Sequence, residues 1–105
     1  MYARNVTLRL KANQAPEFAR AIENDVLPVL RKQNGFRDEM TLVARDGGEA
    51  VAISLWDTKE TADAYGRDAY PRVLKSLVDV VDGTPEIVGY EVTNSTFHEI
   101  GAINN

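Results

Sequence analysis

The stretch AISLWDTKETADAY, residues 52–65, joins an apolar run to the start of a helix. Aliphatic residues and one tryptophan dominate 49–56, a composition that is typical of a strand. Asp57 followed by Glu60 resembles a capping box, so we expect a short helix to begin directly after this strand. Trp56, the single tryptophan of the chain, stands at the junction between the two elements.

The same signals extend outward in both directions. Residues 4–10 alternate between apolar and polar side chains, which indicates a strand with one buried face. A helical spacing of three and four follows, and Pro28 should kink its last turns. We therefore expect, in chain order, a strand at 4–10, a helix from Pro16 to Asn34-Gly35, strands at 36–45 and 49–56, helices from Thr58 to Gly66 and from Pro71 to Val81, a strand at 86–98 and a loose tail at 101–105.

This order of elements defines a fold class. Strand, helix, strand, strand, helix pair and strand form the split βαβ pattern of a ferredoxin-like sandwich, an α+β fold. The 105 residues are enough for a single domain, spanning 1–105. Both helical segments should cover one face of the four-stranded antiparallel sheet, which leaves the other face uncovered.

The uncovered face should require a partner. A sheet face that carries a tryptophan and aliphatic groups is rarely left in water, so we expect a second sheet, a ligand or both to cover it. The residues that we place on this face are Asn5, Thr7 and Arg9 from the first strand and Ala52, Ser54 and Trp56 from the third.

Composition excludes several classes of function. The formal net charge is −4 and no cluster of basic residues occurs, which argues against nucleic acid as a partner. The chain has no cysteine, so disulfides, thiolate nucleophiles and thiolate metal sites are excluded. We find no signal-peptide pattern and no apolar run of membrane-spanning length, and we expect a cytoplasmic protein without membrane contact.

Four stretches carry a resemblance to a known family. They are VLPVLRKQNGF (26–36), AISLWDTKETADAY (52–65), YPRVLKSL (70–77) and TPEIVGYEVTNSTFH (84–98). In this order, the chain resembles the antibiotic-biosynthesis-monooxygenase-like family of the dimeric α+β barrel superfamily. The resemblance implies a homodimer in which two uncovered sheet faces form a barrel, often with exchange of the last strand.

The resemblance also implies a chemistry. Some members of that family are oxygenases that act on phenolic or quinol-type compounds without a cofactor, because the substrate's own anion reduces oxygen. Such a protein needs a dry pocket, a donor for the developing anion and correct positioning. We therefore expect a small aromatic ligand and no cofactor or metal.

A second branch of the family degrades haem with an asparagine, a tryptophan and a histidine ligand. Asn5 matches the asparagine, but Tyr65 stands at the tryptophan position and Leu74 or Lys75 at that of the histidine. Because the iron ligand is missing, we do not expect a haem function.

The candidate residues each have a functional and a structural interpretation. Asn5 could hydrogen-bond a ligand and Arg9 could stabilise its anion, but a backbone contact for Asn5 and a salt bridge for Arg9 are the structural alternatives. Aromatic side chains such as Trp56 could contact a ligand or could simply fill the core. The favoured function is a cofactor-independent monooxygenase, and the alternative is a non-catalytic ligand-binding or structural barrel. We predict Asn5, Arg9 and Trp56 as catalytic residues and Ser54, Tyr65, Tyr70 and His98 as substrate-binding residues.

Overall fold

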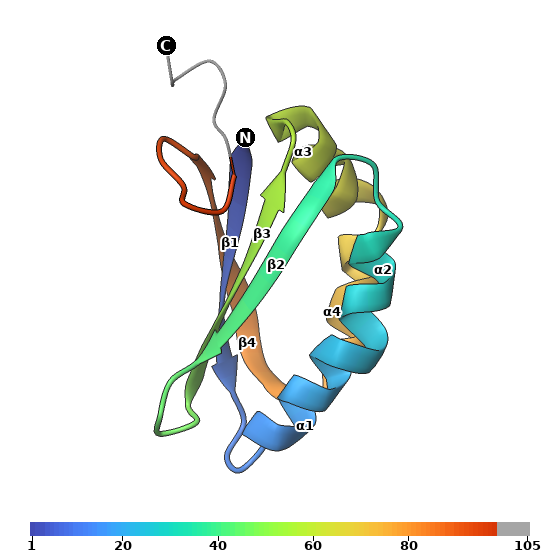
Figure 1. The fold of residues 1–105 in the computed structure, drawn as a ribbon. Helices are drawn as coiled ribbons and strands as arrows, with labels where there is room; N and C mark the ends of the chain where they lie inside the picture. The colour runs from blue at the N-terminus through green and yellow to red at the C-terminus, as the bar shows by residue number, and fades with distance from the viewer. Residues whose placement is uncertain (99–105) are drawn as a thin grey trace.

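The computed structural model describes residues 1–98 and contains a four-stranded antiparallel sheet with the helices on one of its faces (Figure 1). The strand order is β2-β3-β1-β4, which confirms the predicted ferredoxin-like α+β fold. The elements are β1 (Tyr2–Leu10), α1 (Ala15–Ala21), η1 (Ile22–Val26), α2 (Leu27–Arg31), β2 (Phe36–Val43), β3 (Glu49–Trp56), α3 (Lys59–Asp68), α4 (Tyr70–Leu77) and β4 (Val81–Glu91).

The first helical segment is continuous but changes its pitch. α1 passes into a π-helical turn, η1, and then into α2, in which Pro28 stands near the start. Proline lacks an N–H group, so no helical hydrogen bond can reach the carbonyl of Asn24 from that position. The Leu27 N–H instead donates to the Ile22 carbonyl, five residues back. The irregularity is therefore a π-helical turn just before Pro28, whereas we had predicted a kink in the last turns of the helix.

The helix after β3 has a different cap from the one that we predicted. Thr58, rather than Asp57, is the N-cap, and its hydroxyl accepts a hydrogen bond from the Thr61 N–H at 3.1 Å. The Thr58 N–H donates in turn to the Thr61 hydroxyl at 3.3 Å. The prediction was wrong by one residue because threonine can fill both positions of the box in place of an acid.

The last strand was predicted wrongly at both ends. α4 already ends at Leu77, and β4 begins at Val81 and ends at Glu91, so residues 92–98 lie outside the sheet. Gly83 has a φ of 70° within β4, a conformation that glycine adopts without strain. The predicted loose tail at 101–105 lies outside the described residues.

The sheet register corrects the predicted assignment of faces. Ser54 pairs with Arg4, and Ala52 pairs with Val6, so the side chains of each pair share one face. That face is the one under the helices, because Arg4, Val6 and Ser54 are buried against them. Our placement of Ala52, Ser54 and Trp56 on the uncovered face was therefore wrong.

The uncovered face carries the opposite set of β3 side chains. Val51, Ile53 and Leu55 stand there, in register with Thr7, Asn5 and Ala3, as predicted for the polar positions of β1. The face is rich in exposed apolar side chains from the outer strands. These side chains are Met40, Leu42, Val88 and Tyr90, which are between 37% and 54% exposed.

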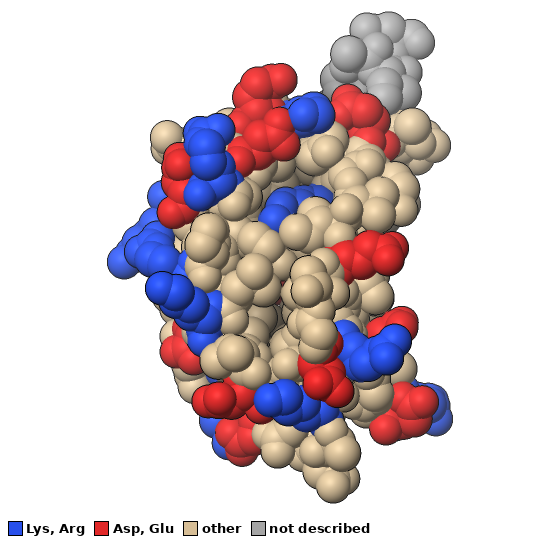
Figure 2. All heavy atoms as spheres, turned by 180° about the vertical axis from the view of Figure 1, so that it is seen from behind, with Lys and Arg blue, Asp and Glu red and all other residues tan. Residues whose placement is uncertain are grey.

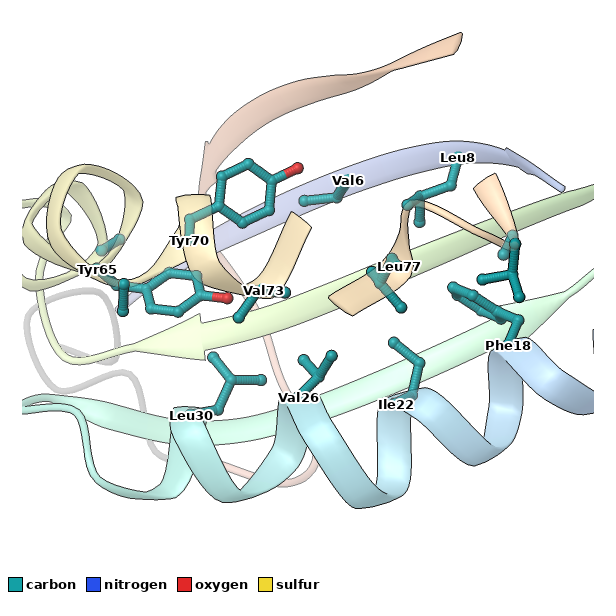
Figure 3. Close-up of a cluster of buried hydrophobic side chains, with 14 of the residues drawn as sticks. Val6, Leu8, Phe18, Ile22, Val26, Leu30, Tyr65, Tyr70, Val73 and Leu77 are labelled. Carbon is teal, nitrogen blue, oxygen red and sulfur yellow. The ribbon is translucent and has the colours of Figure 1, made fainter. Parts of the chain in front are cut away.

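The core lies between the sheet and the helices. One row of core side chains comes from β1, and a second row comes from α1, η1 and α2. The members of the two rows are Val6, Leu8 and Leu10, and Phe18, Ile22, Val26 and Leu30. Figure 3 shows these two rows facing each other, with α4 between them. No helix among residues 1–98 is both long and apolar enough to cross a membrane.

Candidate functional site

A cavity lies between the sheet and the helices. Its volume is about 40 Å³, measured as the space open to the centre of a water molecule, which is room for about three waters. This size limits a ligand to a small molecule. The lining is mostly apolar and comes from the sheet, the first helical segment, α3 and α4; the lining residues are Arg4, Val6, Leu8, Ile22, Val26, Leu30, Glu39, Ala52, Ser54, Tyr65, Tyr70, Val73 and Leu77.

Arg4 is the charged residue at the centre of this site. It is 8% exposed, and no other Lys or Arg among residues 1–98 is buried. Figure 2 shows basic side-chain atoms at the bottom of a hollow that uncharged residues surround. The Arg4 guanidinium carbon lies 4.1 Å from the ring centre of Tyr70 and 5.2 Å from that of Tyr65.

Among the described residues, no carboxylate lies within 4 Å of the Arg4 guanidinium. The two tyrosine rings provide cation–π contacts, but these do not replace a hydrogen-bonded anion. A buried charge of this kind is costly unless it meets an opposite charge. The geometry is therefore suited to a ligand that carries or develops negative charge.

The two tyrosines present hydroxyl groups to the same space. Figure 3 shows the Tyr70 hydroxyl pointing towards Val6 and the Tyr65 hydroxyl pointing towards Val73. The Tyr70 hydroxyl is buried and has no hydrogen-bond partner among the described residues. An unpaired buried hydroxyl is costly, so it is a donor available to a ligand.

Burial also keeps both tyrosines protonated. It raises the pKa of Tyr65 to about 12, although the Arg4 charge acts in the opposite direction. Burial raises the pKa of Tyr70 in the same way, again against Arg4. Both phenols therefore act as hydrogen-bond donors near neutral pH.

Three polar residues form a row across the sheet. Arg4 of β1 stands opposite Ser54 of β3, and Ser54 stands opposite Glu39 of β2. Two strand spacings separate the ends of the row, so the Cα atoms of Arg4 and Glu39 are roughly 10 Å apart. The row thus places a cation, a hydroxyl and an acid along one wall of the cavity.

Glu39 has one oxygen in use. The Thr41 hydroxyl donates to its Oε2 at 2.6 Å, which leaves Oε1 free to accept from a ligand. Burial raises the pKa of Glu39, and the Thr41 hydrogen bond opposes that effect. A carboxylate with a raised pKa and a free oxygen can accept a proton.

Trp56 supports the site from behind. It is fully buried, stacks on Tyr65 with ring centres 5.1 Å apart, and donates from Nε1 to the Ser54 hydroxyl at 2.8 Å. Phe36 meets it edge to face at 5.6 Å. Trp56 holds two lining residues in place but does not itself line the cavity, and its predicted catalytic role stays a prediction.

The remaining predicted residues lie elsewhere. Asn5 and Arg9 point to the uncovered face, where the Asn5 amide lies 3.5 Å from the Thr7 hydroxyl. His98 contacts the carboxylate of Asp38 beside the uncovered face, outside the cavity. The structure thus brings Ser54, Tyr65 and Tyr70 together, with Trp56 packed behind them, and separates Asn5, Arg9 and His98 from them.

Sequence reasoning missed Arg4 and Glu39. The alternation of β1 puts position 4 in phase with Val6 and Leu8, so a charged residue on the buried face could have been noticed. Position 39 lies in a strand whose alternation is weak, because apolar residues are nearly continuous from Met40 to Val43. Among residues 1–98, no group of three or more His, Cys, Asp or Glu residues is arranged to hold a metal ion.

The fold is that of the antibiotic biosynthesis monooxygenase structures, as the sequence resemblance implied. A Nitrosomonas europaea protein assigned by its name to that group superposes with a TM-score of 0.74 at 20% identity, over 90% of this chain and all of the other. The TM-score indicates a shared fold, and an identity this low indicates no more than that. No family model matches the chain.

Two structures of this fold have a more specific description. One is the monooxygenase from the ActVA-Orf6 gene of Streptomyces coelicolor in complex with nanaomycin D, with a TM-score of 0.74 and 16% identity over 93% of this chain and 92% of the other. The other is SnoaB of Streptomyces nogalater, a cofactor-independent oxygenase, with a TM-score of 0.71 and 15% identity over 90% and 95%.

The sequence relatives are longer proteins whose names give no activity. Uncharacterized proteins from two strains of Mycobacterium tuberculosis are each 25% identical over 92 residues. The match covers 88% of this chain but only 41% of either relative, so the chain spans less than half of their length.

Proposed function

We propose that the protein is a monooxygenase that oxidises a small phenol- or quinol-type aromatic without a bound cofactor. The observation that carries this proposal is the buried Arg4, which has no described carboxylate within 4 Å and faces a mostly apolar cavity. Its charge is placed where a phenolate would be stabilised and water largely excluded. The fold shared with a cofactor-independent oxygenase supports the same activity.

The chemistry balances without a further reductant. A para-quinol reacts with one O₂ to give a hydroxyquinone and one water: the ring supplies four electrons, one oxygen atom enters the ring and the other leaves as water. The first step is loss of a hydroxyl proton, because the phenolate donates electrons to oxygen far more readily than the phenol does. The protein must therefore favour the anion and hold it in place.

The site residues take separate parts in this reaction. Arg4 stabilises the phenolate oxygen electrostatically, and the unpaired Tyr70 hydroxyl donates a hydrogen bond to it. Ser54, whose hydroxyl accepts from Trp56, retains its own proton to donate to the ligand. The apolar lining holds the ring and limits its size.

The uncovered face supports a homodimer as part of the same proposal. Exposed apolar side chains of β2 and β4 border the partly buried aliphatic row of β3. A face of this composition is typical of an interface, and a stable one should bury at least about 1,000 Å² in total. Asn5 and Arg9 would then lie at the interface, where their predicted roles depend on what the second chain brings.

The direct test is oxygen uptake. Purified protein with a chelator present should consume oxygen with a panel of phenols and quinols, without added flavin, nicotinamide or metal. Arg4→Gln should lower kcat about a hundredfold, the typical effect of removing one donor to a developing anion. The control is Arg45→Gln, which removes an exposed arginine from the β2–β3 hairpin.

Two outcomes would contradict the proposal. Oxygen uptake that Arg4→Gln leaves unchanged would mean that the cavity is not the reaction site. Saturable binding of the panel without any oxygen uptake would favour the alternative, a non-catalytic ligand-binding barrel.

A further inference from the structure

We propose that the cavity selects single-ring para-quinols, with one ring oxygen at Arg4 and Tyr70 and the opposite oxygen at Glu39, which accepts its proton. This inference rests on the proposed function, because it assigns an orientation and a second proton acceptor to that reaction. It adds Glu39 as a catalytic residue and names the substrate class.

The first argument is the chemistry of the product. A para-quinol must lose protons from two oxygens at opposite ends of the ring before it becomes a quinone. A site that stabilises one oxygen as an anion still needs an acceptor for the second proton. That acceptor has to lie across the ring from the anion site.

The sheet register provides this separation. Arg4 and Glu39 occupy the two ends of the cross-strand row, with Ser54 between them, and all three line the cavity. The guanidinium and the carboxylate are not within 4 Å of each other, so they do not neutralise each other directly. A ligand that has an oxygen at each end can contact both.

The local contacts of the two ends match these roles. Tyr70 has an unpaired buried hydroxyl beside Arg4, which suits an anionic oxygen. Glu39 has one oxygen held by Thr41 and one free, which suits a hydroxyl donor. Burial raises the pKa of Glu39, which makes it a stronger base than an ordinary glutamate.

The size of the cavity limits the ring system. With room for about three water molecules, the space excludes a polycycle, and a single ring with two oxygens enters only if the lining side chains move outward. The π-helical turn η1 contributes Ile22 and Val26 to the wall opposite the sheet. Helical turns of this kind are frequent at functional sites.

The test compares hydroquinone with catechol, whose adjacent hydroxyls cannot reach both ends of the row. Binding is measured without oxygen by the change in Trp56 emission, and turnover is measured by oxygen uptake. Wild-type protein should bind hydroquinone about tenfold more tightly than catechol. Glu39→Gln should reduce that preference severalfold and lower kcat for hydroquinone at least tenfold.

The pH profile separates a proton acceptor from a structural residue. A base works only when it is deprotonated, so the wild-type rate should rise with pH through the raised pKa of Glu39. Glu39→Gln should remove this acidic limb, and Glu39→Asp should restore it with part of the rate. Glu49→Gln, which changes an exposed glutamate at the start of β3, is the control and should keep the wild-type profile.

The failures of the two proposals are distinguishable. If wild-type protein takes up oxygen but Glu39→Gln keeps its rate, pH profile and hydroquinone preference, this inference is overturned and the proposed function stands. If oxygen uptake is absent, the proposed function fails, and the anaerobic preference for hydroquinone alone decides whether the row binds a para-quinol. Equal binding of hydroquinone and catechol by wild-type protein overturns the inference in either case.

Discussion

Arg4 combines a cost in stability with its proposed role in binding a ligand. Its charge is buried beside two tyrosine rings, and no described carboxylate lies within 4 Å of it. Cation–π contacts return only part of the cost of removing the charge from water. Residues that are retained at such a cost are commonly found at functional sites.

Replacing Arg4 should therefore separate stability from activity. Arg4→Met keeps the length of the side chain and removes the charge, so the free energy of unfolding should rise by about 1 kcal/mol. Oxygen uptake should fall at the same time. Urea unfolding followed by Trp56 emission measures the first effect, and a clear loss of stability would show that Arg4 is mainly a structural residue.

Tyr65 makes stability depend on alkaline pH. Its pKa is about 12 in the folded protein against 10 for the free side chain, so the unfolded chain loses this proton first. Between pH 10 and 12 the folded state holds more protons than the unfolded state, and stability falls as the pH rises. The full effect is about 3 kcal/mol, from two pKa units at 1.36 kcal/mol each.

Tyr65→Phe provides the comparison for this effect. The variant has no ionisable hydroxyl at that position, so its stability should fall less steeply between pH 10 and 12 than that of the wild type. Denaturant unfolding at a series of pH values measures both slopes. Parallel curves would mean that Tyr65 ionises normally in the folded protein.

At the scale of the elements, the cap of α3 shows how far local sequence signals reach. The strand-to-helix junction after Trp56 was predicted in the right place, because a capping box and an apolar run coincide there. The identity of the N-cap residue was predicted wrongly, because Asp57 and Thr58 are both favourable N-cap residues. Only the geometry shows that the Asp57 carboxylate contacts Arg37 instead.

This difference can be measured. Thr58→Ala should lower the free energy of unfolding by about 1 kcal/mol, because it removes the acceptor for the Thr61 N–H. Asp57→Ala should cost less than about 0.5 kcal/mol, because its contact with Arg37 is exposed. If Asp57→Ala lowered the free energy of unfolding as much as Thr58→Ala or more, Asp57 would be the N-cap, as the sequence alone had suggested.

The order of elements was predictable, whereas the faces of β3 were not. Strand and helix periods are local properties, and they gave the ferredoxin-like fold from the sequence. Residues 50–56 are apolar or small at nearly every position, so their pattern does not indicate which set faces the helices. The register with Arg4 and Val6 decides it, and this long-range pairing placed Ser54 in the cavity.

The candidate site was missed in part for the same reason. Tyr65, Tyr70 and Ser54 were predicted as substrate-binding residues, Ser54 on the wrong face of the sheet, and all three line one cavity. Arg4 and Glu39 join them only through the pairing of three strands that are distant in sequence. A single sequence does not show that kind of proximity.

At the scale of the whole molecule, the uncovered sheet face predicts the oligomeric state. Ile53 stands near the middle of that face, in register with Asn5 and Met40. Ile53→Glu should place a charge in the interface and convert a dimer to a monomer, as measured by light scattering. Val78→Glu, at an exposed position after α4, is the control and should remain dimeric.

The outcome of this experiment bears on the whole architecture. A wild-type protein that is monomeric at micromolar concentration would contradict the proposed homodimer. Circular dichroism of both variants is needed as well, because a monomer counts only if it is folded.

The most direct measurement of the central claim is the fate of isotopically labelled oxygen. The protein reacts with hydroquinone under ¹⁸O₂, and the product is analysed by mass spectrometry immediately after quenching. A monooxygenase places one labelled oxygen in the hydroxyquinone and the other in water, for each O₂ consumed. An unlabelled benzoquinone accompanied by labelled hydrogen peroxide would show simple oxidation without oxygen transfer, and would contradict the account.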